Sequence, residues 1–130
     1  MRTGWMRVLF VVAGIYDGVL GLAFLLAPTW VFSIHHVAAP EHLAYVQFPA
    51  LLLMLFGLMF FRIAADPVNR RELILYGCGL KLSYCGTVFW YQLATGVPFM
   101  WLPWAWADLV FLALFVVAAR RLGSRVEIAT

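Results

Sequence analysis

The sequence predicts an all-α integral membrane protein, a four-transmembrane-helix bundle, and three observations lead to this fold class. First, 65% of the 130 residues are hydrophobic and only 12% are charged, whereas a soluble domain has about half apolar and about a quarter charged residues. Second, the mean hydropathy is +0.94, which excludes a disordered chain because disorder needs low hydrophobicity and high charge. Third, the apolar residues gather in four stretches, each near the roughly 20 residues that cross a hydrocarbon core about 30 Å thick.

The four stretches predict four transmembrane helices and leave no room for a second domain, so residues 1–130 are expected to form a single domain. Backbone polar groups inside lipid have no water to bond, and a helix satisfies them within one segment. The predicted spans are residues 8–27, 43–65, 73–95 and 99–119.

Prolines and glycines mark the ends of the predicted spans. Pro28 closes the first span, residues 66–67 (Asp-Pro) open the turn after the second, and residues 96–98 (Gly-Val-Pro) form the turn before the fourth. Pro49 and Pro103 lie in the outer parts of the second and fourth spans, where the missing N–H predicts a kink or a late helix start.

The arginines predict how the helices are oriented. Eight of the nine basic residues flank the same ends of the spans, and the loops at residues 28–42 and 96–98 contain no Lys or Arg. The positive-inside rule therefore places both termini in the cytoplasm, with the helices in a bacterial-type inner (plasma) membrane. The net charge of +3 follows from this topology, and a nucleic-acid partner is excluded because it would need a basic stripe on a soluble face. The flanking basic residues are Arg2, Arg7, Arg62, Arg70, Arg71, Arg120, Arg121 and Arg125.

Three ionisable residues interrupt the apolar spans: Asp17 in the first, Lys81 in the third and Asp108 in the fourth. Each lies ten to twelve residues from the arginine at the inner end of its span, which at 1.5 Å per residue is about 15–18 Å. In a hydrocarbon core about 30 Å thick, all three side chains are therefore expected near the midplane.

The energetic cost of these side chains in lipid predicts that they meet inside the bundle. Each costs roughly 2.5–3.5 kcal/mol at a helix centre, so three isolated side chains would cost about 8–10 kcal/mol. That cost rivals the whole stability of a small domain. We therefore expect Lys81 to lie between Asp17 and Asp108. Because three ionised groups sum to minus one, we also expect one Asp to be protonated, or the site to hold an extra proton or cation.

The residues around the charges extend this predicted centre. Gly14 and Gly18 in the first span form a small-xxx-small pair, which lets another helix approach closely. Tyr84 lies three residues after Lys81 on the same helix face, and Gln92 continues that face eleven residues after Lys81. The predicted ligand or proton site comprises Asp17, Lys81, Asp108, Tyr84, Gln92 and Trp104.

Aromatic residues cluster at the predicted outer interface. One interpretation is an aromatic belt at the membrane surface. The other is an aromatic-lined outer mouth for a flat or lipophilic ligand, because four tryptophans near the end of the third span and the start of the fourth exceed what a belt requires. The aromatic residues in question are Trp30, Tyr45, Trp90, Tyr91, Trp101, Trp104 and Trp106.

Two interpretations of the charged cluster stay open. It is either an ionic network that only holds helices together, or a site for a proton, an ion or a ligand. Ionisable groups inside a membrane usually mark functional sites, and polar contacts between membrane helices contribute only about 0.6 kcal/mol on average in one measured system. A purely structural cluster would therefore cost more free energy, in burying its charges, than its contacts between helices return.

Other chemistry has little support in the sequence. Cys78 and Cys85 lie about 10 Å apart along one helix, beyond the Cα separation of about 7 Å that a disulfide needs, so both are expected to be free thiols. No hydrolase, nucleotide-binding or metalloprotease motif is present, and no catalytic residue can be named from the sequence.

The outer loop contains a group of weak metal candidates. Imidazole and carboxylate groups are ligands for zinc or copper, and His35, His36 and His42 lie near Glu41. Their spacing matches no strong metal motif, so the alternative is a set of polar residues at the membrane interface.

The first span contains the segment GIYDG at residues 14–18 and ends in LLAP at residues 25–28. In length, topology and this Gly-rich, charge-bearing first span, the chain resembles the small four-helix bacterial membrane proteins grouped as DoxX-like. The resemblance covers most of the chain at the level of hydropathy and assigns no role to individual residues. It implies an accessory membrane protein connected with quinone or sulfur redox metabolism.

The sequence thus predicts a small membrane protein whose central Asp–Lys–Asp cluster binds a small lipophilic ligand, such as a lipid or a quinone, or which serves as a redox accessory. The alternatives are a proton-coupled small-molecule transporter, a structural subunit of a larger membrane complex, and a membrane enzyme that uses an Asp as general acid. Its expected partners are the lipid bilayer and either further copies of the chain or a larger membrane complex.

Overall fold

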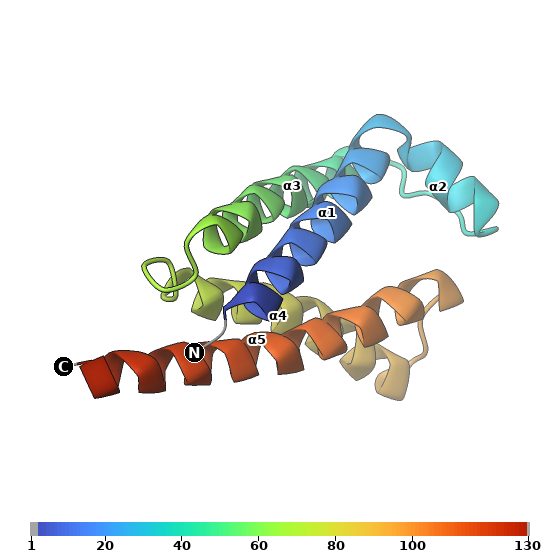
Figure 1. Ribbon diagram of the computed structural model, residues 1–130. Coiled ribbons are helices and arrows are strands. Elements are labelled where there is room, and N and C mark those ends of the chain that lie inside the picture. The colour runs from blue at the N-terminus through green and yellow to red at the C-terminus, as the bar shows by residue number, and fades with distance from the viewer. Residues whose placement is uncertain (1–2, 130) are drawn as a thin grey trace.

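The computed structural model describes residues 3–129, with side chains described for residues 3–123, and the regular secondary structure in that range is helical (Figure 1). Four segments are long and apolar enough to cross a membrane: α1, α3, α4 and the stretch that begins with η1 and continues into α5. The predicted fold class, an all-α bundle of four membrane-spanning helices, is confirmed. Arg2 and the side chain of Arg125 lie outside the described residues. The elements are α1 (Gly4–Leu26), α2 (Pro28–Ile34), α3 (Ala44–Ala65), α4 (Leu73–Ala94), the 3₁₀ helix η1 (Phe99–Trp101) and α5 (Leu102–Ala129).

The helix boundaries agree with the predicted spans except at two ends. α3 and α4 each begin and end within one residue of the prediction. α1 starts at Gly4 rather than at residue 8, and α5 continues to Ala129 rather than ending at residue 119. Both extensions lie at the same end of the molecule. The apolar run limits only the part of a helix that lies in lipid, whereas the backbone hydrogen bonds can continue the helix into water.

The prolines explain the irregular elements at the other end. Pro28 stands in the first turn of α2, where its fixed φ and missing N–H suit helix initiation, so the predicted outer loop contains a helix that the sequence analysis missed. Val31 and Phe32 of α2 are buried. Pro103 lies in the first turn of α5, after η1, as a late helix start predicts, whereas Pro49 lies inside α3.

The helices are arranged as two halves. α1 packs along α3, and α4 packs along α5 (Figure 1). The halves lie close together near the chain termini and diverge toward α2 (Figure 1), and a hydrophobic cluster joins residues of both halves at each end. The cluster near the termini includes Met6, Phe10, Phe60, Ile74, Phe115 and Leu122, and the cluster near α2 consists of Phe24, Val31, Phe32, Ala50 and Met100.

Close packing of α1 on α3 depends on glycine. A Cβ atom at Gly21 would lie 2.6 Å from the carbonyl oxygen of Ala50, and one at Gly57 would lie 3.1 Å from the carbonyl oxygen of Gly14 and 3.2 Å from the backbone nitrogen of Gly18. The expected close approach of another helix at Gly14 and Gly18 is therefore confirmed. A larger residue here would push the helices apart, and such overpacking typically costs about 1–3 kcal/mol.

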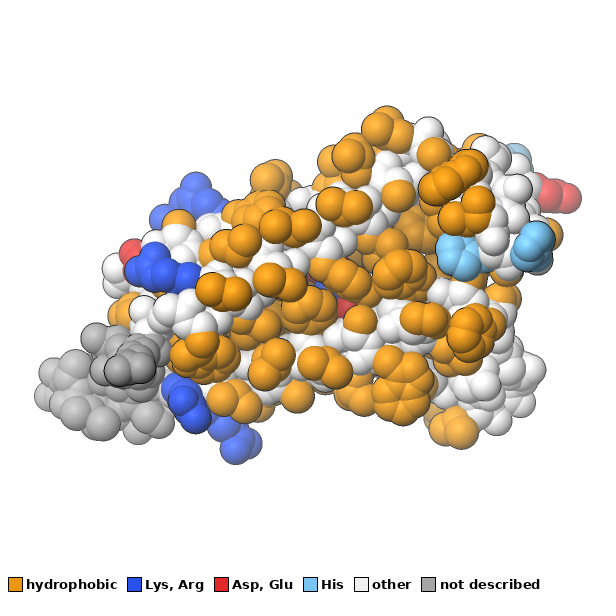
Figure 2. Space-filling view, turned by 45° about the vertical axis from the view of Figure 1, so that its right-hand side comes forward, with side chains coloured by type: hydrophobic (Ala, Val, Ile, Leu, Met, Phe, Trp, Pro, Cys, Tyr) orange, Lys and Arg blue, Asp and Glu red, His pale blue; other side chains and the backbone are white. Residues whose placement is uncertain are grey.

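Arginines gather at the end of the molecule near the termini, called here the arginine end (Figure 2). Arg7 donates hydrogen bonds to the carbonyl oxygens of Ala64 and Ala65 at 3.2 and 2.8 Å, which join the start of α1 to the end of α3. In the turn that follows α3, Asn69 donates hydrogen bonds to the Asp66 carboxylate, and these bonds lower the pKa of Asp66. The described arginines at this end are Arg7, Arg62, Arg70, Arg71, Arg120 and Arg121.

Candidate functional site at the Asp–Lys–Asp cluster

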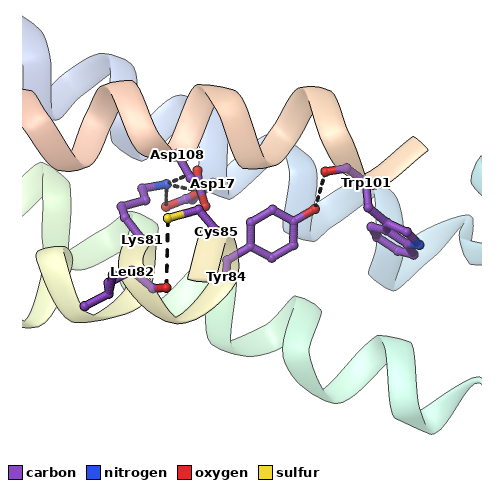
Figure 3. Close-up of polar contacts among 7 residues, drawn as sticks. All are labelled: Asp17, Lys81, Leu82, Tyr84, Cys85, Trp101 and Asp108. Carbon is purple, nitrogen blue, oxygen red and sulfur yellow. Dashed lines mark hydrogen bonds and ion pairs between the residues drawn. The ribbon is translucent and has the colours of Figure 1, made fainter. Parts of the chain in front are cut away.

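Lys81 on α4 lies between two buried carboxylates, Asp17 on α1 and Asp108 on α5 (Figure 3). The Nζ atom of Lys81 lies 2.9 Å from each carboxylate oxygen of Asp17 and 3.0 Å from Oδ1 of Asp108. The prediction that these three side chains meet is confirmed. They are called here the charged cluster.

Helical spacing directs these side chains to the inside. On α4, the buried residues Gly77, Lys81 and Cys85 follow one another at intervals of four residues and form one stripe. Asp17 shares the buried stripe of α1 with the glycines that contact α3. Each charge is therefore held away from lipid by the same periodicity that buries the apolar residues around it.

The charged cluster connects the two halves of the molecule. Lys81 and Asp108 belong to the α4–α5 half, whereas Asp17 belongs to the α1–α3 half. The two hydrogen bonds from Lys81 to Asp17 therefore cross the interface between the halves. Along α1, Asp17 lies between the two hydrophobic clusters that join the halves at their ends.

Aromatic rings surround the ammonium group of Lys81. Its Nζ atom lies 5.1 Å from the ring centroid of Tyr16, 5.7 Å from that of Phe60 and 5.0 Å from that of Phe111. The negative faces of such rings attract a cation, by about 2 kcal/mol when the cation is desolvated. These rings were not among the predicted site residues, although Phe111 lies three residues after Asp108 and helical spacing places it on the same face.

Two polar atoms at the charged cluster have no hydrogen-bond partner among the described residues. One is Oδ2 of Asp108, since Lys81 bonds only to Oδ1 of that carboxylate. The other is the buried hydroxyl oxygen of Tyr16. Lys81 itself has three N–H donors, and its three hydrogen bonds all go to carboxylate oxygens. The unpaired acceptor that another molecule can reach is thus Oδ2 of Asp108, since the hydroxyl oxygen of Tyr16 is buried.

Asp108 is the member of the charged cluster that comes nearest to the surface. Its side chain is 9% exposed, compared with 1% for Asp17 and 0% for Lys81. Acidic side-chain atoms are visible in a narrow gap between the two halves, with hydrophobic side chains on both sides of the gap (Figure 2). This opening faces sideways, toward the position of the lipid.

Two further predicted site residues lie between the charged cluster and the end near α2. The hydroxyl of Tyr84 donates a hydrogen bond to the carbonyl oxygen of Trp101 at 3.0 Å, which ties α4 to η1 (Figure 3). Trp104 packs against Tyr16, with ring centroids 6.0 Å apart. Trp104 is therefore next to the cluster, whereas the hydroxyl of Tyr84 is occupied by the backbone.

Gln92 is a correction to the predicted site. Its side chain is exposed, and its Oε1 atom accepts a hydrogen bond of 3.0 Å from the backbone N–H of Val97 in the turn after α4. Gln92 lies eleven residues after Lys81, which is about 16 Å along a helix. The two residues share a helix face but not a depth, so the structure does not bring Gln92 to the charged cluster.

The aromatic residues at the outer end divide into two groups. Trp101 stacks on Phe24 with centroids 5.9 Å apart, and it meets the ring of Phe32 edge-on at 5.8 Å. Trp101 therefore fills the space between the halves instead of lining an open mouth. Trp104 packs on Tyr16, and the remaining ones project outward, as residues of an aromatic belt do. These exposed residues are Trp30, Tyr45, Trp90, Tyr91 and Trp106.

The two cysteines and the three histidines of the outer loop were the other candidates for chemistry. Cys78 and Cys85 are free thiols, as expected. The Nδ1 atom of His35 lies 2.8 Å from a backbone carbonyl oxygen one turn earlier. Within the described residues, no three His, Cys, Asp or Glu side chains come together in a way that could hold a metal ion. The metal interpretation of His35, His36 and His42 therefore has no support in the geometry.

No family model, curated protein or solved structure shows significant similarity to the chain. The resemblance to DoxX-like proteins accordingly stays a prediction from the sequence.

Proposed function

We propose that the protein binds a small lipophilic molecule at the charged cluster, and that this molecule enters sideways from the bilayer. The observation that carries the proposal is the unpaired Oδ2 atom of Asp108, whose side chain is 9% exposed. An unpaired carboxylate oxygen at membrane depth is unfavourable, because neither water nor lipid can bond to it. A bound molecule that donates a hydrogen bond to this oxygen removes that cost.

The hydrogen bonds already made select the chemistry of the ligand. Because the hydrogen bonds of Lys81 all go to the two carboxylates, a quinone carbonyl would compete with Asp17 and Asp108 for the ammonium group and would leave Oδ2 of Asp108 unpaired. A hydroxyl or an amine can instead donate a hydrogen bond to Oδ2 of Asp108. The ring of Trp104 offers an aromatic surface beside these groups. We therefore favour a quinol, an alcohol or an amine with an apolar body over a quinone.

The charge of the cluster favours the amine among these candidates. With Asp17, Lys81 and Asp108 all ionised, the cluster carries a net charge of minus one. In a low-dielectric environment this excess charge favours a bound proton or cation. A protonated amine would supply this charge, whereas a neutral quinol or alcohol would not.

Asp108→Asn is expected to weaken the binding of a short-chain quinol about tenfold, because hydrogen bonds to charged groups contribute about 1.5–3 kcal/mol. The binding is measured by tryptophan fluorescence quenching of the purified protein in detergent, with the matching quinone and an alkylamine of the same length as comparisons. Gln92→Ala serves as the control, since Gln92 is a polar residue of α4 that lies away from the cluster.

Three outcomes of this measurement are informative. Stronger binding of the quinol or the amine than of the quinone, lost only in Asp108→Asn, is the expected result. Equal binding by the wild type and Asp108→Asn contradicts the proposed role of Asp108. If neither the quinol nor the amine binds to the wild type, the cluster is an ionic connection between helices and no more.

We also propose that the arginine end faces the cytoplasm of a bacterial cell, in the inner membrane, and that the protein acts as a DoxX-like accessory beside redox enzymes or further copies of itself. The support for the orientation is the gathering of six described arginines at one end. In a background with both native cysteines replaced by serine, Arg70→Cys should react with a membrane-impermeant thiol reagent only after cells are opened. Pro40→Cys should react in intact cells, and the reverse pattern would invert the topology.

A further inference from the structure

A separate apolar groove lies between α3 and α4 at the arginine end. It has a volume of about 320 Å³, which is within the range of roughly 300–1,000 Å³ found for ligand sites. The groove is on the outside of the bundle and does not include the charged cluster. Its lining residues are Leu55, Phe56, Leu58, Met59, Arg62 and Tyr76.

The groove is apolar along α3 and polar at one end. Leu55, Leu58 and Met59 precede Arg62 by seven, four and three residues, so these four residues share one face of α3. Arg62 lies in the last turn of α3, and Tyr76 lies in the first turn of α4. The polar end of the groove is therefore at the membrane interface, and the apolar part extends toward the middle of the bilayer.

The guanidinium group of Arg62 is available to a ligand. Within the side chains described for residues 3–123, no hydrogen-bond acceptor or carboxylate is in contact with it. Two other arginines at this end differ, since Arg7 donates to the end of α3 and Arg71 donates to the carbonyl oxygen of Val68 at 2.7 Å.

The surroundings favour an anion at the open end of the groove. Six described arginines lie at the arginine end, against two acidic side chains, Asp66 and Glu72. Basic pockets between transmembrane helices are typical sites for anionic lipid headgroups, and a guanidinium group matches the geometry of a phosphate.

We propose that this groove binds one anionic phospholipid, with an acyl chain along α3 and the phosphate on Arg62. Tyr76 also lines the groove, and its hydroxyl would supply a second donor to the phosphate. This site is independent of the function proposed for the charged cluster, because the two share no residue.

The test is native mass spectrometry of the full-length protein in detergent, with phosphatidylglycerol and phosphatidylcholine of identical acyl chains as probes. The wild type is expected to retain phosphatidylglycerol in preference, and Arg62→Gln is expected to lower this preference about tenfold. Arg120→Gln is the matched control, since Arg120 is an exposed arginine of the same end on α5, outside the groove. Leu58→Trp, which fills the groove, should weaken the binding of both lipids.

Three different results would overturn the proposed lipid site. Equal effects of Arg62→Gln and Arg120→Gln would mean that charge attracts the lipid without a specific site, which overturns the proposal. Displacement of phosphatidylglycerol by an equal concentration of glycerol 3-phosphate would show that the acyl chain takes no part, and would also overturn it. A lipid-free dimer that Leu58→Trp separates into monomers would assign the groove to a second copy of the chain instead.

Discussion

Lys81→Met is expected to lower the free energy of unfolding by about 3–5 kcal/mol, the range found when one partner of a buried ion pair is removed. Methionine fills a similar volume but leaves Asp17 and Asp108 close together with no positive charge between them. The loss should be far larger than that of a neutral polar contact between membrane helices, which averages about 0.6 kcal/mol in one measured system. It should also shrink in acid, since protonation of the two carboxyl groups removes their repulsion.

The measurement is denaturant-induced unfolding in a mild detergent, followed by the loss of helical circular dichroism. The control is the triple variant Asp17→Asn, Lys81→Met, Asp108→Asn, which removes all three charges and should recover most of the lost stability. A Lys81→Met protein as stable as the wild type would show that the ion pairs contribute nothing to holding the halves together. A triple variant as unstable as Lys81→Met would attribute the loss to packing around the lysine stem instead of to charge.

The charged cluster was predictable because a membrane constrains a helix in two ways at once. The arginines fix where each span meets the interface, so counting residues from them gives the depth of Asp17, Lys81 and Asp108. The cost of a charge in lipid then requires each of these side chains to face inward. Three side chains at one depth, all facing the interior of a small bundle, have to meet.

Residues whose depth or inward direction is not fixed in this way were predicted less well. Gln92 shares a helix face with Lys81, but no arginine count or burial cost fixes its depth, and it lies at the exposed end of α4. Trp101 was expected at the interface by its position in the sequence, yet its ring packs inward on Phe24 because the halves diverge there and leave space between them. Hydropathy does not report how far apart two helices lie.

The pairing of helices also lay beyond the sequence analysis. Gly14 and Gly18 indicated that some helix approaches α1 closely, and the partner turned out to be α3, which contributes Gly57 to the same contact. Short connections would have allowed several arrangements of four helices. The arrangement in two halves follows from which backbones can approach each other, a property that depends on pairs of residues from different spans.

The two acids of the charged cluster are expected to differ in their effect on stability. Asp17→Asn should lower the free energy of unfolding by about 3 kcal/mol, because Asp17 accepts two of the three hydrogen bonds of Lys81 and such bonds to charged groups contribute about 1.5–3 kcal/mol each. Asp108→Asn should cost less than about 1 kcal/mol, because it removes one weaker contact together with the excess negative charge.

This asymmetry has a structural basis that the same unfolding measurement can test. With Asn at position 17, Lys81 keeps a carboxylate only within its own half, so the ionic connection between the halves is lost. With Asn at position 108, a neutral pair between Lys81 and Asp17 still joins the two halves. If Asp108→Asn proved as destabilising as Asp17→Asn, Asp108 would be a structural member of the cluster. If Asp108→Asn leaves the stability nearly unchanged, the Asp108 carboxylate of the wild type is not needed to hold the fold and is free to bind a ligand. A loss of ligand binding in Asp108→Asn then reports on the site and not on unfolding.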